Sequence, residues 1–213
     1  MQDTVTQVLK EQKFDSLEDR MLYYRRQTDY RLKHQSYVLV MLDGKNFSQK
    51  VKKRFKRPFD SEFITLMNKT AAHVCSEVQG AKFAYVQSDE ISILVTDFET
   101  PETSAYFDFR LCKMLSVIAS TATAYFNRLV AKKIFSGPFA EQALDNEPIY
   151  EFDAKVWTVP CANDAFAWFL YRQNDCKRNS KQQAAQTYLS HKELLRKNTE
   201  EQIHDEQPTI SNQ

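Results

Sequence analysis

The chain has 213 residues, a length that suits one large domain or one domain with an appendage. Its formal net charge is +1, so only local clusters of charge can indicate a charged partner. The cysteines Cys75, Cys112, Cys161 and Cys176 are too widely spaced for a paired zinc site or a disulfide framework. Only three glycines are present, which excludes a Walker loop and a GxGxxG turn, so any phosphate must be held by metal ions, side chains or helix ends.

The first 12 residues are polar and contain no apolar signal core. No apolar run approaches the roughly 20 residues that a membrane-spanning helix needs. We therefore expect a cytoplasmic protein with no membrane partner.

Hydrophobic periodicity and turn residues divide the chain into four parts. We expect an N-terminal helical segment at 1–35, a catalytic core at 36–160, C-terminal helices at 161–197 and a disordered polar tail at 198–213. The predicted elements are a helix at 17–32, a strand at 36–42, a helix at 62–78, a hairpin at 82–97, a helix from 101–104 to 130, a strand at 152–159, and helices at 163–173 and 179–196.

The core order of strand, helix, strand, strand, helix, strand predicts an α+β fold of the ferredoxin-like type, βαββαβ, with additional helices. In this topology the second hairpin strand lies antiparallel between the first strand and the first hairpin strand. The carboxyl end of the first strand therefore shares an edge with the hairpin turn. This places Asp43 beside Asp89 and Glu90, although 46 residues separate the two aspartates in sequence.

Two carboxylates at neighbouring strand ends suit magnesium, a hard cation that takes one or two carboxylates plus waters and phosphates. With the carbonyl of Gly44 as a further oxygen, Asp43 and Asp89 could hold two ions about 3.5–4 Å apart, the arrangement used for displacement at phosphorus. The alternative is that Asp43-Gly44 is an ordinary turn and Ser88-Asp89-Glu90 a solvated hairpin tip.

Cations cluster near these acids. The segment from Lys45 to Arg57 contains seven cations and no acid, which favours binding of a triphosphate or RNA backbone over a merely solvated loop. Further along, Arg110 and Lys113 lie one helical turn apart and suit either phosphate or surface salt bridges. Lys177, Arg178 and Asn179, at an expected helix start, favour an anion site. Phe47 suits either base stacking or core packing, and core packing is the better interpretation for most aromatics here.

Several ordered motifs resemble the tRNA(His) guanylyltransferase family. The resemblance covers about residues 38–180. Its last motif, Lys177-Arg178-Asn179-Ser180, is similar to the bacterial and archaeal guanylyltransferase-like branch. The motifs that carry it are Leu42-Asp43-Gly44-Lys45-Asn46-Phe47, Arg57-Pro58-Phe59-Asp60, Tyr85-Val86-Gln87-Ser88-Asp89-Glu90-Ile91-Ser92, Arg110 with Lys113, Phe152-Asp153-Ala154-Lys155-Val156, Arg172-Gln173-Asn174-Asp175-Cys176 and Lys177-Arg178-Asn179-Ser180.

The resemblance implies a polymerase-like palm with two Mg²⁺ ions and with ATP or GTP as substrates. It implies nucleotide addition to the 5′ end of tRNA, in the 3′-to-5′ direction, by templated repair or by guanylylation, and assembly as a tetramer. Asp43, Gly44 and Asp89 take the metal positions, and Glu90 belongs to the catalytic acidic motif. The implied nucleotide-binding residues are Lys45, Asn46, Phe47, Ser48, Ser88, Arg57 and Asp60. The residues expected to bind phosphate or tRNA are Lys52, Lys53, Arg54, Arg110, Lys113, Lys177, Arg178 and Asn179.

Two alternatives stay open. Another palm-type enzyme, such as a nucleotide cyclase, shares the two acids but needs no tRNA. A catalytically inactive tRNA-binding protein would keep the fold and lose nucleotide incorporation.

Overall fold

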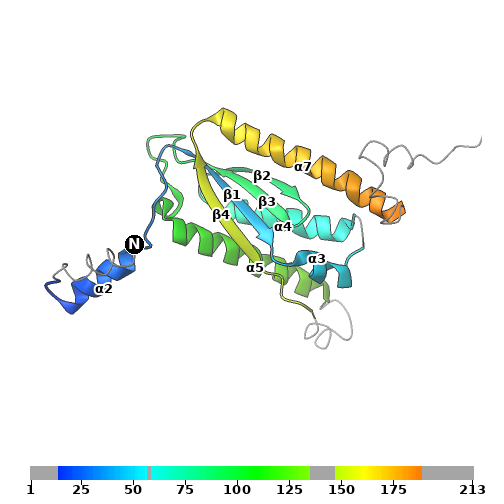
Figure 1. The fold of residues 1–213 in the computed structure, drawn as a ribbon, viewed down its shortest axis with the longest axis horizontal. Helices are drawn as coiled ribbons and strands as arrows, with labels where there is room; N and C mark the ends of the chain where they lie inside the picture. The colour runs from blue at the N-terminus through cyan, green and yellow to red at the C-terminus, as the bar shows by residue number, and fades with distance from the viewer. Residues whose placement is uncertain (1–13, 57–58, 135–146, 189–213) are drawn as a thin grey trace, which may run out of the picture.

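The computed structural model describes residues 14–56, 59–134 and 147–188. Its centre is a four-stranded antiparallel sheet with helices on both faces (Figure 1). The elements are α2 (Leu17–Arg26), β1 (Tyr37–Gly44), α3 (Phe47–Lys50), the 3-10 turn η1 (Val51–Lys53), α4 (Ser61–Glu77), β2 (Ala81–Gln87), β3 (Glu90–Val95), the 3-10 turn η2 (Tyr106–Phe109), α5 (Leu111–Ile134), β4 (Phe152–Val159) and α7 (Ala162–Tyr188).

The strand order is β2-β3-β1-β4, so β3 lies between β2 and β1 as the sequence predicted. β1 runs antiparallel to both β3 and β4. In these pairings Asp43 faces Glu90 on one side and Asp153 on the other. The predicted α+β fold is confirmed, and one edge of the sheet collects the carboxyl end of β1, the hairpin tip and the start of β4.

The core lies between the sheet and the helices α4 and α5, while α7 crosses the opposite face (Figure 1). Side chains alternate between faces along a strand, so Val38, Val40 and Leu42 enter the core with Ile91 and Ile93. Asp43 and Glu90 consequently lie on the face that α7 covers. The fold thus sets the acids between the sheet edge and α7.

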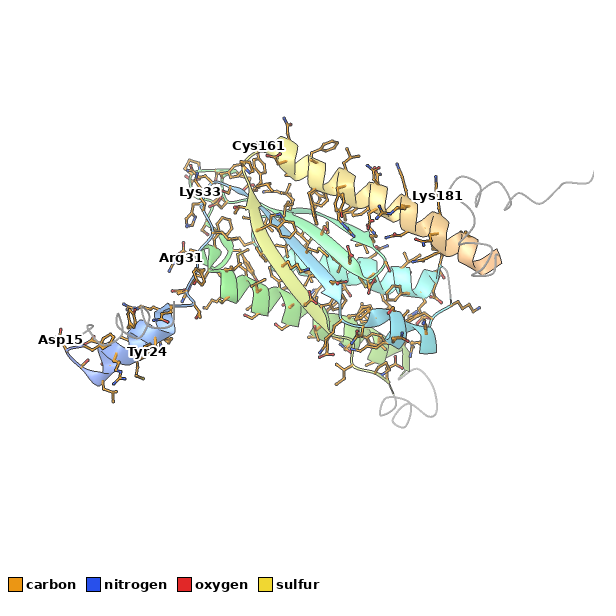
Figure 2. All side chains as sticks on the ribbon, in the orientation of Figure 1. Asp15, Tyr24, Arg31, Lys33, Cys161 and Lys181 are labelled. Atoms are coloured by element: carbon orange, nitrogen blue, oxygen red, sulfur yellow. The ribbon has the colours of Figure 1, made fainter. Side chains whose placement is uncertain are left out.

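Four helix predictions were wrong in their limits. α5 begins at Leu111, later than the predicted 101–104, because Phe107, Asp108 and Phe109 all have positive φ and interrupt helical geometry. The two predicted C-terminal helices form one continuous helix, α7. Cys161 and Lys181 mark its start and its far part in Figure 2.

The N-terminal helix α2 projects away from the sheet (Figure 1), ends at Arg26 instead of the predicted Leu32, and contains no buried residue. Ser16 caps it by accepting a hydrogen bond from the amide of Asp19. The predicted polar tail at 198–213 lies outside the described residues. Within the described ranges, none of the helices has the length and apolar character required to cross a membrane.

Candidate active site

The acidic site is built from the end of β1 and the tip of the β2–β3 hairpin. The amide of Gly44 donates a hydrogen bond to the carbonyl of Asp89 over 3.1 Å, which joins the two acidic segments directly. Only Ser88 and Asp89 lie between the paired residues Gln87 and Glu90, so the hairpin turn has two residues. The structure therefore brings Asp43 and Asp89 to one place, as the topology predicted.

Neighbouring negative charges affect the pKa of Asp43. Burial raises the pKa of this carboxyl, and the charges of Asp89 and Asp153 raise it further. Asp153 stands opposite Asp43 on β4, and no role was predicted for it. The strand position was predicted correctly, but only the antiparallel pairing of β4 with β1 brings its first residues to this edge.

These residues fit magnesium by their chemistry. Among the described side chains, no group of three or more His, Cys, Asp or Glu residues is arranged to hold a metal ion. Magnesium commonly uses only one or two protein carboxylates and completes its shell with water and substrate phosphates. The Gly44–Asp89 hydrogen bond sets the two acidic segments side by side, and a cation between their carboxylates would relieve the repulsion that raises the pKa of Asp43. Asp43, Asp89 and the Gly44 carbonyl can supply oxygen ligands at this edge, where the carboxylates of Glu90 and Asp153 also lie.

The side chain of Glu90 forms an ion pair with α7. Its carboxylate accepts a hydrogen bond from the guanidinium of Arg172 on α7. Burial raises the pKa of Glu90, and the charges of Asp43 and Asp89 add to this, against the opposing effect of Arg172. Sequence reasoning assigned no role to Arg172, because the polar stretch around it was expected to end one helix and start another.

The cationic segment after Gly44 is not a loop but forms α3 and η1. Acids from a distant part of the chain meet it: Lys45 and Lys50 pair with Glu151 at 3.2 and 3.1 Å, and Arg54 pairs with Glu147 at 3.2 Å. The segment itself contains no acid, but the pairing of β4 with β1 brings the acidic residues that precede β4 alongside it. The side chain of Lys45 remains 59% exposed beside the acidic edge.

Phe47 is a core residue. Its side chain is 1% exposed, and its ring centroid lies 4.9 Å from that of Phe152 and 5.3 Å from that of Tyr150. Core packing, the alternative to base stacking, therefore describes this side chain, and a nucleotide contact through the backbone of Phe47 stays a prediction. A Cβ at Gly44 would stand 2.4 Å from Cγ of Phe47, so glycine is required there by the packed ring.

Asp60, which was predicted to contact nucleotide, has a structural task in this structure. It caps α4 by accepting hydrogen bonds from the amides of Glu62 and Phe63 at 2.8 and 2.9 Å, and it accepts a third from Lys56. These bonds hold the pKa of Asp60 below its usual range.

Replacing Asp60 with alanine should lower the free energy of unfolding by about 1 kcal/mol, because three amides lose their acceptor. Since the pKa is lowered in the folded state, the stabilisation by Asp60 is present at neutral pH and is lost on acidification through that pKa. Urea unfolding at pH 7 and pH 3 measures both effects. An equal loss at the two pH values would contradict the cap.

The other residues predicted to bind nucleotide, phosphate or tRNA in this part of the chain lie at α3, at η1, in the hairpin turn or just before α4. Asn46 and Ser48 are exposed at the start of α3, and Ser88 donates a hydrogen bond to Asp89 over 2.9 Å. Lys52 is exposed on η1. The side chain of Lys53 and all of Arg57 lie outside what the structure describes, so their roles stay predictions.

Two predicted phosphate contacts lie far from this edge. Arg110 and Lys113 flank the start of α5, where Arg110 pairs with Asp29 at 2.8 Å and Lys113 lies over the ring of Phe107. The backbone of Arg110 forms an isolated β-bridge with that of Arg31, which precedes β1. Arg110 and Lys113 therefore lie at the opposite end of the sheet from Asp43. In this structure both side chains make surface contacts, which was the alternative to phosphate binding.

The predicted anion site at Lys177, Arg178 and Asn179 lacks its helix start, because these residues lie inside α7. Arg178 and Asn179 both contact Asp175, which also binds Gln87 at the hairpin tip. Lys177 is exposed. The segment therefore lies close to the acidic site even though it offers no helix N-terminus.

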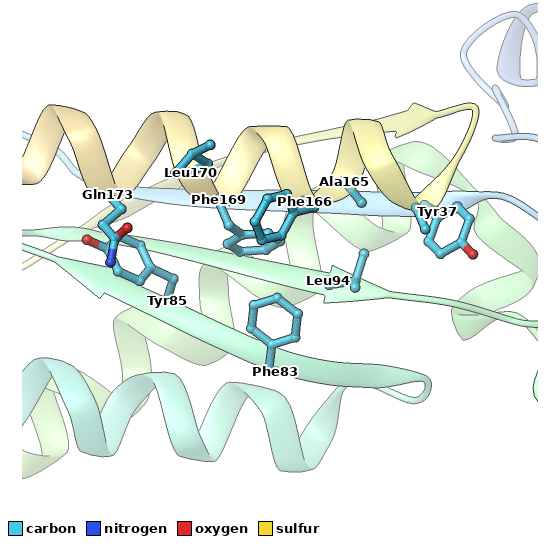
Figure 3. A pocket seen from close by; sticks show the side chains of 10 residues that line it. Tyr37, Phe83, Tyr85, Leu94, Ala165, Phe166, Phe169, Leu170 and Gln173 are labelled. Atoms are coloured by element: carbon cyan, nitrogen blue, oxygen red, sulfur yellow. The ribbon is translucent and has the colours of Figure 1, made fainter.

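A separate apolar pocket of about 380 Å³ lies between α7 and the strands β2 and β3 (Figure 3). Its residues are Tyr37, Phe83, Tyr85, Leu94, Ala162, Ala165, Phe166, Phe169, Leu170 and Gln173. None carries a charge at neutral pH, so this pocket is not suited to a triphosphate.

Comparison with known proteins adds a second kind of evidence. The family described as tRNAHis guanylyltransferase matches residues 19–160 of the chain, which include most of α2 and every later element through β4. The chain belongs to the tRNA(His) guanylyltransferase family.

Relatives within this family extend the likeness. The tRNA(His) guanylyltransferase of Neurospora crassa is 30% identical over 146 residues, which are 68% of this chain and 46% of that protein. A bacterial tRNA(His) guanylyltransferase (Thg1)-like protein in complex with ATP matches with a TM-score of 0.79 and 32% identity, covering 88% of this chain and 77% of that one. A bacterial protein of the same description in complex with GTP gives a TM-score of 0.73 and 31% identity, covering 83% and 78%. The chain thus spans about half the length of the Neurospora relative.

Proposed function

We propose that the chain is a magnesium-dependent nucleotidyltransferase that adds nucleotides to the 5′ end of tRNA in the 3′-to-5′ direction. The observation that carries the proposal is the junction of Asp43 and Asp89 through the Gly44–Asp89 hydrogen bond, in a fold shared with proteins bound to ATP and GTP. Family membership supports tRNA and nucleoside triphosphates as substrates. Family likeness also supports a tetramer, which light scattering would test.

Asp43, Asp89 and the Gly44 carbonyl would hold the magnesium ions. When bound, these ions supply charge stabilisation at phosphorus and lower the pKa of an attacking hydroxyl. The protein's own contribution is to fix the two acids relative to each other, because backbone pairing holds their strands in register.

Lys45 and Lys50 would orient the triphosphate. Both ammonium groups already lie together around Glu151, whose pKa they lower by hydrogen bonding. A triphosphate carries more charge than this single carboxylate, so it competes for the same two cations. Binding through these contacts weakens as salt concentration rises.

The test is incubation of the protein with Mg²⁺, labelled GTP or ATP, and a tRNA that lacks its first 5′ nucleotide. We expect label at the tRNA 5′ end, with the added base complementary to the opposite strand if repair is templated. Cyclic product formed without tRNA would identify a cyclase instead. Binding of tRNA with no incorporation under any nucleotide would overturn the enzymatic proposal.

A further inference from the structure

A closed ring of polar contacts connects the hairpin tip to α7. Gln87, the last residue of β2, donates a hydrogen bond to Asp175 over 3.2 Å. Asp175 pairs with Arg172 at 3.3 Å, and Arg172 binds Glu90, the first residue of β3. Gln87 and Glu90 are paired across the hairpin, which closes the ring. Both residues that flank the Ser88-Asp89 turn are therefore held from α7.

The turn inside this ring is one that needs support. Ser88 has a φ of 51°, in the left-handed region that side chains other than glycine and asparagine rarely adopt. A strained turn persists when its surroundings fix it. Here the neighbours on both sides of Ser88 and Asp89 are fixed by Arg172 and Asp175, and Asp89 itself is fixed by Gly44.

Arg172, the centre of this ring of contacts, is buried. Arg172 is only 6% exposed, and its guanidinium lies 5.8 Å from the ring centre of Trp168 and 5.5 Å from that of Tyr171. One planar guanidinium reaches both carboxylates, a geometry that lysine does not reproduce. Arg172 thus joins two acids, one from the helix and one from the hairpin.

We propose that Arg172 is a positioning residue, which acts with Asp175 as a clamp that holds the Ser88-Asp89 turn where Asp89 faces Asp43. Arg172 itself touches neither nucleotide nor metal in this assignment. Glu90 then contributes to the site as the hairpin residue that Arg172 binds. The catalytic consequence rests on the proposed function, while the structural consequence is independent of it.

The structural test compares hydrogen exchange at two backbone amides that donate hydrogen bonds. In ¹⁵N-labelled protein, the amide of Gly44 reports the hydrogen bond to Asp89, and the amide of Thr96, which donates to the carbonyl of Gly80 at the other end of the hairpin, serves as an internal reference. Arg172→Gln should speed hydrogen exchange at Gly44 by about tenfold or more and leave Thr96 unchanged. Arg172→Lys should fall between this variant and the wild type.

Arg31→Gln is the matched control, because Arg31 pairs with Asp108 at the opposite end of the sheet. It should leave exchange at Gly44 at the wild-type rate. If Arg172→Gln does not fold, Glu90→Gln, which removes only the charge, should still speed exchange at Gly44. Unchanged exchange at Gly44, or equal acceleration at Gly44 and Thr96, would overturn the clamp.

A second readout connects the clamp to turnover. Arg172→Gln should reduce kcat for nucleotide transfer about 10- to 100-fold with a smaller change in KM, because Asp89 is displaced while Lys45 and Lys50 still bind the triphosphate. A wild-type kcat in this variant would refute the positioning role. If the wild-type protein transfers no nucleotide, the proposed function fails, and exchange at Gly44 still decides the clamp.

Discussion

Asp43→Asn should abolish nucleotide transfer and at the same time raise the melting temperature of the metal-free protein. Activity should fall about 1000-fold or more, equivalent to about 4 kcal/mol of transition-state stabilisation, because an amide is a poor ligand for magnesium. Stability should rise because the pKa of Asp43 is raised in the folded state, so its charged form opposes folding at neutral pH. Single-turnover kinetics and thermal unfolding measure the two effects.

Magnesium and Asp153 provide the controls for this result. Added Mg²⁺ should raise the melting temperature of the wild type by binding the folded state, and it should not do so for Asp43→Asn. Asp153→Asn removes another charge that raises the pKa of Asp43, so it should stabilise the protein while retaining the response to Mg²⁺. Near wild-type turnover in Asp43→Asn would leave the two-metal proposal without support.

Phe47→Ala should lower the free energy of unfolding by about 3–5 kcal/mol, the range for truncating a buried aromatic. The ring of Phe47 lies among those of Phe126, Tyr150 and Phe152, with centroids 5.5, 5.3 and 4.9 Å away, and its loss leaves a cavity among them. Urea unfolding measures the change.

Phe59→Ala is the matched control for this truncation, because the side chain of Phe59 is 56% exposed and should contribute within about 0.5 kcal/mol. If Phe47 instead contacted nucleotide, its alanine variant would raise KM and keep its unfolding midpoint. The two variants therefore separate a core role from a binding role for the family motif that contains Phe47.

The order of elements was enough to predict the acidic edge. Strand and helix order follow from local periodicity, and few topologies accommodate βαββαβ. Asp43 and Asp89 could therefore be placed together from sequence, and the limits of β4 were predicted correctly at 152–159.

Contacts that depend on register between distant segments could not be predicted. The pairing of Lys45 with Glu151 depends on how β4 aligns with β1, and the pairing of Arg172 with Glu90 depends on how α7 crosses the sheet. Asp60 and Phe47 lie in family motifs that suggested ligand contacts, and the motifs alone did not show that Asp60 caps α4 or that the ring of Phe47 is buried in the core. A sequence motif can identify a residue, but its contacts depend on the tertiary structure.

The two-residue hairpin turn has a consequence for natural variation in length. Surface hairpins ordinarily accept insertions and deletions at their tips. Here one added residue that shifted β3 by a single position would exchange its two faces, sending Ile91 and Ile93 toward α7 and Glu90 toward the core. Homologous chains should therefore keep this turn at constant length, with gaps in their alignments displaced to other connections.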